Sequence, residues 1–265
     1  MSSNINESTK LYLREMKLPG MLAVLNELTS SAEKQNWSYS TFINQLCEHE
    51  HEVRKNRKLE LLIKRSNLPD GKTLATLNDQ YLSLQIQRTM ASLLEGNFVE
   101  RAENVLAFGL PGRGKTHFLA ALARELIFSH QYSVLFTPTY KLVQQLLRAK
   151  ESNRLDRELK KLEKIDIIII DDLGYVEHSQ EEMEVFFTFL AERYERKSLM
   201  ISSNLTFSNW DKIFKNKMTA MAAVDRLVHH SVILEFDGES IRSKVAAKRR
   251  TLTDNNQSQK EANID

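Results

Sequence analysis

The feature that most constrains the fold is a glycine-rich segment, residues 109–116, which reads Gly-Leu-Pro-Gly-Arg-Gly-Lys-Thr and matches the phosphate-loop pattern G-x-x-x-x-G-K-[ST]. Four apolar residues, 105–108, precede it as a short buried strand would. The residues after it repeat apolar side chains at helical spacing, which predicts a packed helix. The apolar positions of this helix are Leu119, Leu122, Ala123, Leu126 and Ile127.

A strand, a glycine turn and a helix in this order direct backbone N–H groups and the positive end of the helix dipole at a bound phosphate. Lys115 can reach the β- and γ-phosphates, and Thr116 can offer its hydroxyl to Mg²⁺. The alternative is a glycine-rich turn with a chance lysine, but both flanks favour a nucleotide site. The residues expected at the nucleotide are Gly109, Leu110, Pro111, Gly112, Arg113, Gly114, Lys115 and Thr116.

Beyond the loop, apolar runs alternate with amphipathic segments. We expect further strands at residues 133–136, 167–170, 199–201 and 232–234, and helices at 139–150, 154–164 and 180–196. The isoleucine run 167–170 is too short for a helix and too apolar for an exposed edge, so it predicts a central strand. The pattern predicts an α/β fold with a doubly wound, mostly parallel five-stranded P-loop sheet.

Polar side chains follow two of these strands. Asp171 and Asp172 come directly after the isoleucine run, and Asn204 follows strand 199–201. Ligands of open α/β sheets bind at the carboxyl ends of the strands. We therefore expect Asp171 to hold Mg²⁺ through water, Asp172 to orient or deprotonate the attacking water, and Asn204 to sense the γ-phosphate or hold that water. The alternatives are acids that cap a strand end and an ordinary Ser-Ser-Asn turn.

The amino-terminal part reads as helical. We expect a frayed segment at residues 1–7 and helices at 8–17, 19–34 and 40–65, followed by a turn at 67–71 and a short helix at 79–94. The expected domains are a helical DNA- or partner-binding domain (1–70), a linker helix (71–96) and a P-loop ATPase domain (97–250). The polar tail 251–265 has almost nothing to bury, so we expect it to be disordered.

The third helix carries a basic stretch, with six basic residues against two acidic ones between residues 51 and 65. On a helix, Arg54, Lys58 and Arg65 fall within about 40° of one another, so they could follow a phosphate backbone. The equal alternative is a solvated helix face. The candidate DNA contacts in this helix are Arg54, Lys55, Lys58 and Arg65.

Composition limits other functions. A net charge of +2 is too small to argue for nucleic acid by itself. The single cysteine, Cys47, excludes an internal disulfide and a cysteine metal site, and we expect it to be buried.

Adjacent histidines, His229 and His230, cannot share one helix face and have no evident third ligand, so we expect no metal there. No segment is long and apolar enough to span a membrane, which favours a soluble cytoplasmic protein.

Taken together, these residues resemble the AAA+ branch of phosphate-loop ATPases, and more closely the IstB-type transposase helpers, which are relatives of the DnaC-type helicase loaders. The similarity extends over almost the whole chain. The Asp-Arg-Leu-x-His-His run is its most particular element. The resemblance is carried by residues 104–106, 114–117 (Gly-Lys-Thr-His), 171–175 (Asp-Asp-Leu-Gly-Tyr), 202–204 (Ser-Ser-Asn) and 225–230 (Asp-Arg-Leu-Val-His-His).

The resemblance implies roles for further residues. His117 would join the nucleotide site, Asn204 would be the first sensor, and Arg226 would be an arginine finger that reaches the γ-phosphate of a neighbouring subunit. Arg242 is a weaker candidate for a second sensor. Basic residues on and after the helix 139–150 would face DNA, although acidic neighbours equally allow a solvated face; these residues are Lys141, Arg148, Lys150 and Arg154.

Two positions depart from the family pattern. Leu110 stands where proline is frequent, which should be harmless, and Asp172 stands where many relatives have glutamate. The shorter side chain of Asp172 reaches less far, which favours a slow ATPase that acts as a nucleotide-timed switch.

The resemblance implies an ATP- and Mg²⁺-dependent protein that assembles on double-stranded DNA as a homo-oligomer through ATP-bridged interfaces, and then presents that DNA to a transposase. One alternative is a replicative helicase loader, which would share every ATPase residue. A more remote alternative is a small-molecule phosphoryl transferase. The sequence argues against it, because no arginine-bearing lid follows the nucleotide motifs.

Overall fold

The structure is a computed structural model that describes residues 2–78, 80, 82–175, 179–205, 209–210, 225–237 and 240–241. The chain divides into two compact units, residues 1–61 and 62–265. Two sequence expectations, the disordered tail 251–265 and the second sensor Arg242, lie outside the described residues.

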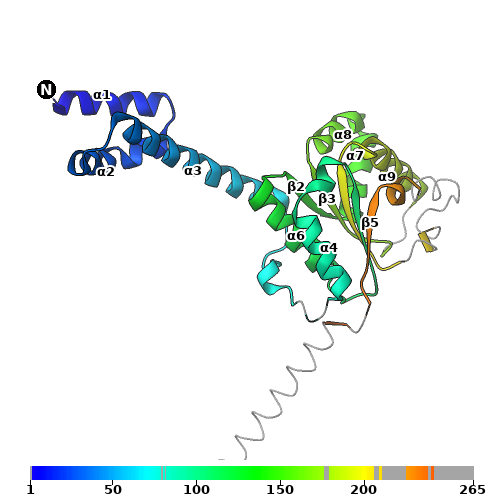
Figure 1. Ribbon diagram of the computed structural model, residues 1–265. Coiled ribbons are helices and arrows are strands. Elements are labelled where there is room, and N and C mark those ends of the chain that lie inside the picture. The colour runs from blue at the N-terminus through cyan, green and yellow to red at the C-terminus, as the bar shows by residue number, and fades with distance from the viewer. Residues whose placement is uncertain are drawn as a thin grey trace, which may run out of the picture. The chain divides into compact units, whose positions relative to one another are not determined.

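The first unit is built from α1 (Ser2–Glu15), α2 (Pro19–Gln35) and most of α3 (Tyr39–Ser66) (Figure 1). Helix α1 begins at Ser2, six residues before the expected start at residue 8. Pro19 opens α2, where its missing N–H costs no helical hydrogen bond. Leu13 and Leu25 are buried between the helices.

Cys47 is exposed, which corrects the expectation that it would be buried. The less exposed positions of α3 recur at residues 42, 45, 46, 49, 50 and 53, which is the spacing of one helix face. Cys47 lies outside that stripe. The most fully buried residue of the stripe is the charged Glu50.

The second unit contains a five-stranded parallel sheet, which confirms the predicted fold class. The strands are β1 (Asn104–Phe108), β2 (Val134–Pro138), β3 (Ile167–Leu173), β4 (Ser198–Ser203) and β5 (Ser231–Glu235). Their order is β2-β3-β4-β1-β5, and all four pairings are parallel. The isoleucine strand β3 is internal, as its composition predicts, and all four isoleucines are fully buried.

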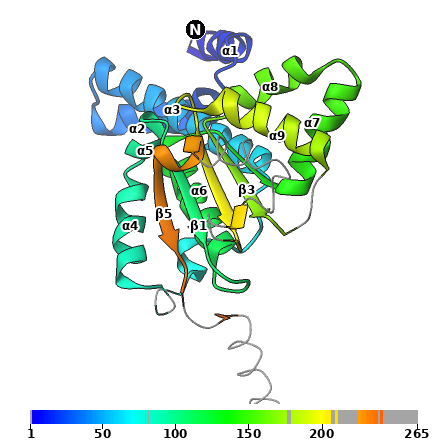
Figure 2. The same cartoon turned by 90° about the vertical axis from the view of Figure 1, so that its right-hand side faces the viewer.

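Helices cover both faces of the sheet (Figures 1 and 2). Helix α6 (Lys115–His130) packs against β1, β3 and β4, with α4 (Leu84–Leu94) beside it and alongside the edge strand β5. Helices α7 (Thr139–Glu151), α8 (Leu155–Glu163) and α9 (Gln180–Arg193) form the other layer. Alternate strand residues such as Leu106, Ile168 and Ile201 join their core, as the period of a strand requires.

Short elements complete the second unit. They are the 3₁₀ turn η1 (Leu74–Thr76), α5 (Asn97–Glu100) and a helical turn at 225–229 before β5. The helix expected at residues 79–94 begins only at Leu84, because the Ser83 hydroxyl accepts from the Ile86 N–H and caps it there. None of the described helices is long and apolar enough to cross a membrane.

Candidate nucleotide-binding site

The glycine loop connects the central strand β1 to α6 and is held from one side by the chain that follows β5. Gly109 has a φ of 145°, and a Cβ at this position would lie 2.3 Å from the backbone oxygen of Phe236. Arg113 donates to that same oxygen at 2.9 Å, and the Ile241 N–H donates to the Gly112 oxygen at 3.0 Å. Only glycine permits such a close approach at residue 109.

Lys115 lies at the first turn of α6 and is buried, with 6% of its surface exposed. Its ammonium donates to the Gly109 oxygen at 2.6 Å and to the Leu110 oxygen at 3.1 Å. The side chain therefore folds back over the loop that precedes its own helix. This places its positive charge at the mouth of the backbone cradle, beside the helix N-terminus.

Asp171 lies at the carboxyl end of β3, directly behind the start of α6. Its Oδ1 accepts from the Thr116 hydroxyl at 2.9 Å and from the Ser202 hydroxyl at 2.5 Å. Burial raises the pKa of Asp171 above its ordinary value, the nearby carboxylate of Asp172 adds to the rise, and the two hydroxyl donors oppose it. A buried carboxylate that already touches a threonine hydroxyl is a suitable donor set for Mg²⁺.

A β-bulge distinguishes the two adjacent acids. Ile170 pairs with Ile201 and Leu173 with Ser203, so two residues of β3 stand opposite the single residue Ser202. Asp172 takes a φ of 58°, in the left-handed region, and its N–H donates to the Ser202 hydroxyl at 2.9 Å. Asp171 is consequently buried behind α6, whereas Asp172 is exposed and reaches the cavity.

The site is a cavity of about 510 Å³ in the second unit. Asn204 contributes an Oδ1 that is buried and has no hydrogen-bond partner among the described residues, so it can accept from a bound group. Gly109, Leu110 and Arg113 line a smaller neighbouring cavity that also touches Asn204. The predicted residues that line the larger cavity are Pro111, Gly112, Gly114, Lys115, Thr116, His117, Asp172 and Asn204.

Three further cavity residues, Lys72, Tyr175 and Ile241, were missed by sequence reasoning. Tyr175 was quoted only as part of the family motif, and Lys72 precedes every nucleotide motif by more than thirty positions. No sequence signal marks Lys72, because it reaches the cavity only through the packing of residues 69–76 on α6.

That packing has specific contacts. Arg124 of α6 donates to the Lys72 oxygen at 3.3 Å and to the Pro69 oxygen at 3.2 Å. The His117 ring lies 3.0 Å from the Thr76 hydroxyl and 3.3 Å from the Thr73 oxygen. Desolvation lowers the pKa of His117, which favours the neutral ring at neutral pH. The side chain of His117 therefore ties the phosphate-loop helix to the segment that precedes the sheet.

Arg226 is not among the cavity residues. It lies in the helical turn 225–229, and its guanidinium carbon is 4.9 Å from the centre of the Phe187 ring on α9. Its Nη1 is buried and has no hydrogen-bond partner among the described residues. The structure thus brings the phosphate loop, Asp172 and Asn204 together at one cavity. The predicted arginine finger, Arg226, lies outside that cavity.

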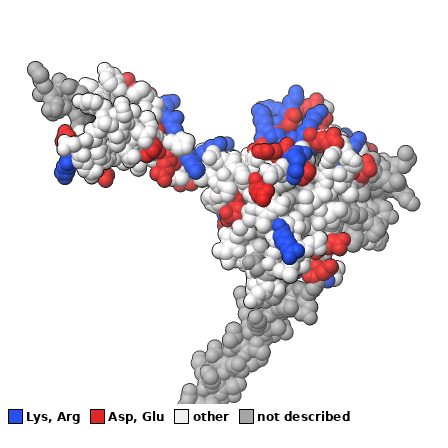
Figure 3. Space-filling view, viewed as in Figure 1, with Lys and Arg blue, Asp and Glu red and all other residues white. Residues whose placement is uncertain are grey.

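The candidate DNA contacts differ in their surroundings. In the first unit, Arg54 pairs with Glu50 at 2.7 Å and donates to the Lys17 oxygen at 3.0 Å, so it has a structural role. Lys55 and Lys58 are exposed and form no ion pair within the described part of the chain. In the second unit, Lys150 pairs with Glu184 at 3.3 Å. Figure 3 shows basic and acidic side chains interleaved over α7 and α8.

The remaining predicted DNA contacts have no ion pair to Asp or Glu within the described ranges. Arg65 is exposed near the end of α3, and Lys141 is exposed on α7. Arg154 precedes α8, where its backbone oxygen accepts from the Glu158 N–H at 3.1 Å. Arg148 is exposed on α7. None of these four residues lines the nucleotide cavity.

The comparisons with known proteins agree with the site. The sequence profile of the family described as IstB-like ATP binding protein matches residues 11–249. A protein of Sinorhizobium fredii (strain NBRC 101917 / NGR234), named for an insertion sequence and ATP binding, is 35% identical over 91% of this chain and 80% of its own. A similarly named protein of insertion sequence IS21 from Pseudomonas aeruginosa is 34% identical over 93% of this chain and 92% of its own.

Solved structures show the same fold at lower identity. The crystal structure of the DnaC helicase loader has a TM-score of 0.52 and 18% identity, and the match covers 58% of this chain and 89% of that one. The DnaI structure has a TM-score of 0.54 and 20% identity, with 64% of this chain and 95% of that chain covered.

Proposed function

Because the chain belongs to the family of IstB-like ATP-binding proteins, we propose that it is an ATP-dependent helper of transposition. It would bind ATP with Mg²⁺, assemble with further copies of itself on double-stranded DNA, and present that DNA to a transposase. The proposal depends most on one observation, the convergence of the glycine loop, Asp172 and Asn204 on one cavity with Asp171 directly behind it.

Each residue would have a separate task at the nucleotide. The loop N–H groups and Lys115 would hold the phosphates. The Lys115 ammonium donates to two loop oxygens, and a bound phosphate would compete with these oxygens for its hydrogen bonds. Thr116 and Asp171 would hold Mg²⁺, whose charge would favour the ionised form of a carboxyl that burial makes harder to ionise. The ion would supply charge neutralisation at the β- and γ-phosphates.

Hydrolysis to ADP and phosphate would depend on Asp172 and Asn204. The buried Oδ1 of Asn204 would accept a hydrogen bond from the attacking water, and Asp172 would orient or deprotonate it. An aspartate at this position has one methylene fewer than the glutamate of many relatives. We therefore propose a slow ATPase whose bound nucleotide acts as a timer.

Assembly would complete the site. Because Arg226 lies away from the cavity of its own chain, it would act on the γ-phosphate held by a neighbouring copy, as an arginine finger does. ATP would then bridge two copies. DNA would be held through its phosphates, and Lys55 and Lys58 are the candidates in the first unit that form no ion pair within the described residues.

The test is the mass of the particle formed by the full chain on double- or single-stranded DNA of equal length, with ATP, ADP or no nucleotide. We expect large particles only on duplex DNA with ATP. The variant Lys55→Gln/Lys58→Gln should weaken duplex binding and lower the salt slope by about two units. The matched control is Lys160→Gln/Lys164→Gln, which removes the same charge from exposed positions of the second unit.

Other results would favour the alternatives. Tighter binding to single strands, with duplex binding unaffected in the Lys55→Gln/Lys58→Gln variant, would favour a helicase loader over a transposition helper. ATP turnover that needs neither DNA nor assembly would favour a phosphoryl transferase. Particle mass independent of nucleotide would contradict the ATP-bridged assembly.

A further inference from the structure

The most distinctive chemistry outside the nucleotide cavity is a group of three side chains in the second unit, Glu195, His229 and His230, here called the histidine cluster. Each offers one ligand atom, and these atoms lie within 4.8 Å of one another. His230 Nε2 is 3.1 Å from a carboxylate oxygen of Glu195, and the two imidazole rings are 4.6 Å apart at an angle of 84°.

The sequence shows no evident third ligand for the two histidines, but the fold brings the Glu195 carboxylate beside them. The argument that adjacent histidines cannot share one face applies only inside a helix. His229 is the last residue of the helical turn 225–229, and His230 already belongs to the turn that leads into β5. Because the backbone leaves the helix between them, the two rings need not diverge by the 100° of a helical step. Glu195 comes from a remote part of the sequence, the turn after α9.

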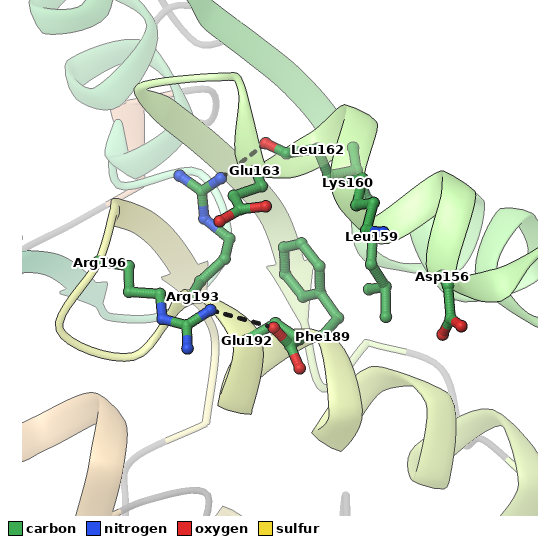
Figure 4. Close-up of a pocket in the computed structure, with 9 residues that line it drawn as sticks. All are labelled: Asp156, Leu159, Lys160, Leu162, Glu163, Phe189, Glu192, Arg193 and Arg196. Carbon is green, nitrogen blue, oxygen red and sulfur yellow. Dashed lines mark hydrogen bonds and ion pairs between the residues drawn. The ribbon is translucent and has the colours of Figure 1, made fainter.

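Both segments are fixed by backbone contacts. The His230 oxygen accepts from the Asn104 N–H at 2.7 Å, at the start of β1. Glu195 takes a φ of 56° in a turn where the Arg193 oxygen accepts from the Arg196 and Lys197 N–H groups. The Arg193 guanidinium, buried at 3% exposure, donates to the Leu162 oxygen (Figure 4). It also donates to the Ser198 oxygen. The backbone under the cluster is thus held, while its side chains remain exposed.

We propose that the histidine cluster binds a divalent transition-metal ion of the zinc class, through two imidazole nitrogens and one carboxylate oxygen, with water in the remaining position. Two imidazoles and one carboxylate suit Zn²⁺, Ni²⁺ or Cu²⁺, whereas Mg²⁺ and Ca²⁺ prefer oxygen ligands alone. Ligand bonds of about 2.0–2.2 Å require ligand atoms roughly 3.3 Å apart. The three ligand atoms would therefore have to move closer together when the ion binds. Side-chain rotation can bring them together, because the His230 side chain is 43% exposed and the Glu195 side chain is 55% exposed.

The ion would act as a clamp. The helical turn that ends at His229 also carries Arg226, whose guanidinium packs on Phe187 of α9. A metal bound to Glu195 would join this turn to the end of α9 at a second point. The segment that carries Arg226 would then be held at both its aromatic contact and its histidines. Metal binding at the histidine cluster would require neither ATP nor DNA.

The test is titration of the full chain with Zn²⁺ by calorimetry, in a buffer with excess Mg²⁺ to occupy oxygen-only sites. We expect one Zn²⁺ site per chain that disappears in His229→Ala. This variant keeps the contact between His230 Nε2 and the Glu195 carboxylate, so it separates metal binding from that contact. Glu195→Gln should weaken the site by about tenfold or more. The control, His49→Ala/His51→Ala on α3, should bind as the parent does.

A second measurement guards against misfolding. With a chelator present, the His229→Ala variant should melt at the parental temperature, and Zn²⁺ should then raise the melting temperature of the parent but not that of the variant. Unchanged Zn²⁺ binding in His229→Ala, parental affinity in Glu195→Gln, or loss of the site in the control would each overturn the proposal.

Discussion

Glu50 of the first unit offers the sharpest test of how the amino-terminal helices are held. It is buried at 4% exposure, and one of its carboxylate oxygens accepts from the N–H groups of Gly20 and Met21 at 2.7 and 3.1 Å. Helix α2 has no side-chain cap of its own at Leu18. A carboxylate thirty residues away in the chain therefore caps this helix and complements its dipole.

Removing Glu50 should destabilise α2 by a predictable amount. Loss of a helix cap costs about 0.5–2 kcal/mol, and a buried N–H left unpaired costs about 1–3 kcal/mol. The ion pair with Arg54 adds little, about 0–1 kcal/mol, because the Arg54 side chain is 59% exposed. Water lies close in so small a unit, so we expect about 2 kcal/mol for Glu50→Ala and about 1 kcal/mol for Glu50→Gln, whose amide oxygen still accepts.

The assay is native-state hydrogen exchange of the α2 amides in the full chain. A loss of about 2 kcal/mol should speed their exchange by about 30-fold, since 1.4 kcal/mol is a factor of ten. The matched control is Glu52→Gln, an exposed acid two positions away. Parental exchange rates in Glu50→Ala, or equal acceleration in the control, would refute the capping argument.

The pH dependence has a definite sign. Burial by itself would raise the pKa of Glu50, but hydrogen bonds from Arg54, Met21 and Gly20 outweigh it and hold the pKa below the ordinary value of 4.5. A carboxyl whose pKa is lowered by folding stabilises the protein above its unfolded pKa. The difference between parent and Glu50→Gln should therefore be constant above about pH 4.5 and shrink as the pH falls through the folded pKa.

Four further predictions concern the nucleotide site. Lys115→Ala should weaken ATP binding by about tenfold or more in calorimetry, because it removes a charge from the phosphates; unchanged affinity would contradict the assignment. Asp172→Asn should retain ATP but hydrolyse it about a hundredfold more slowly. Arg226→Ala should bind ATP and hydrolyse it poorly, and mixing it with Asp172→Asn should restore turnover; verified co-assembly without rescue would exclude a finger in trans. Gly109→Ala should weaken ATP binding, because its Cβ would lie 2.3 Å from the Phe236 oxygen; parental affinity would show that the loop adapts.

The parts of the fold that sequence predicts are those set by local spacing. The isoleucine run and the apolar stripe of α6 identify a buried strand and its helix, because the periods of strands and helices differ. The positions of Lys115 and Thr116 follow from the glycine pattern, since a turn of fixed length determines where the helix begins. The family motif likewise predicts that Asp172 and Asn204 lie near the loop.

Long-range packing is what the sequence does not reveal. Lys72 reaches the nucleotide cavity because Arg124 and His117 hold the segment around it, and these contacts span more than forty positions. Cys47 was expected to be buried because it is small and apolar, yet it lies outside the buried stripe of α3, which includes the charged Glu50. A buried acid is stable there only because two N–H groups from another helix meet it, which no local pattern encodes.

The two acids after the isoleucine run show why a motif predicts a site better than secondary structure does. In a regular strand, adjacent side chains point to opposite faces, so Asp171 and Asp172 could not both serve one nucleotide. The bulge opposite Ser202 removes this restriction, since it inserts one extra residue and turns Asp172 into the left-handed region. The Ser202 hydroxyl donates to the Asp171 carboxylate while it accepts from the Asp172 N–H, so a single side chain from β4 holds both acids. The two acids therefore depend on a serine of the neighbouring strand, which holds both of them in place. A strand with the same apolar run but no bulge would place only one of the acids at the phosphates.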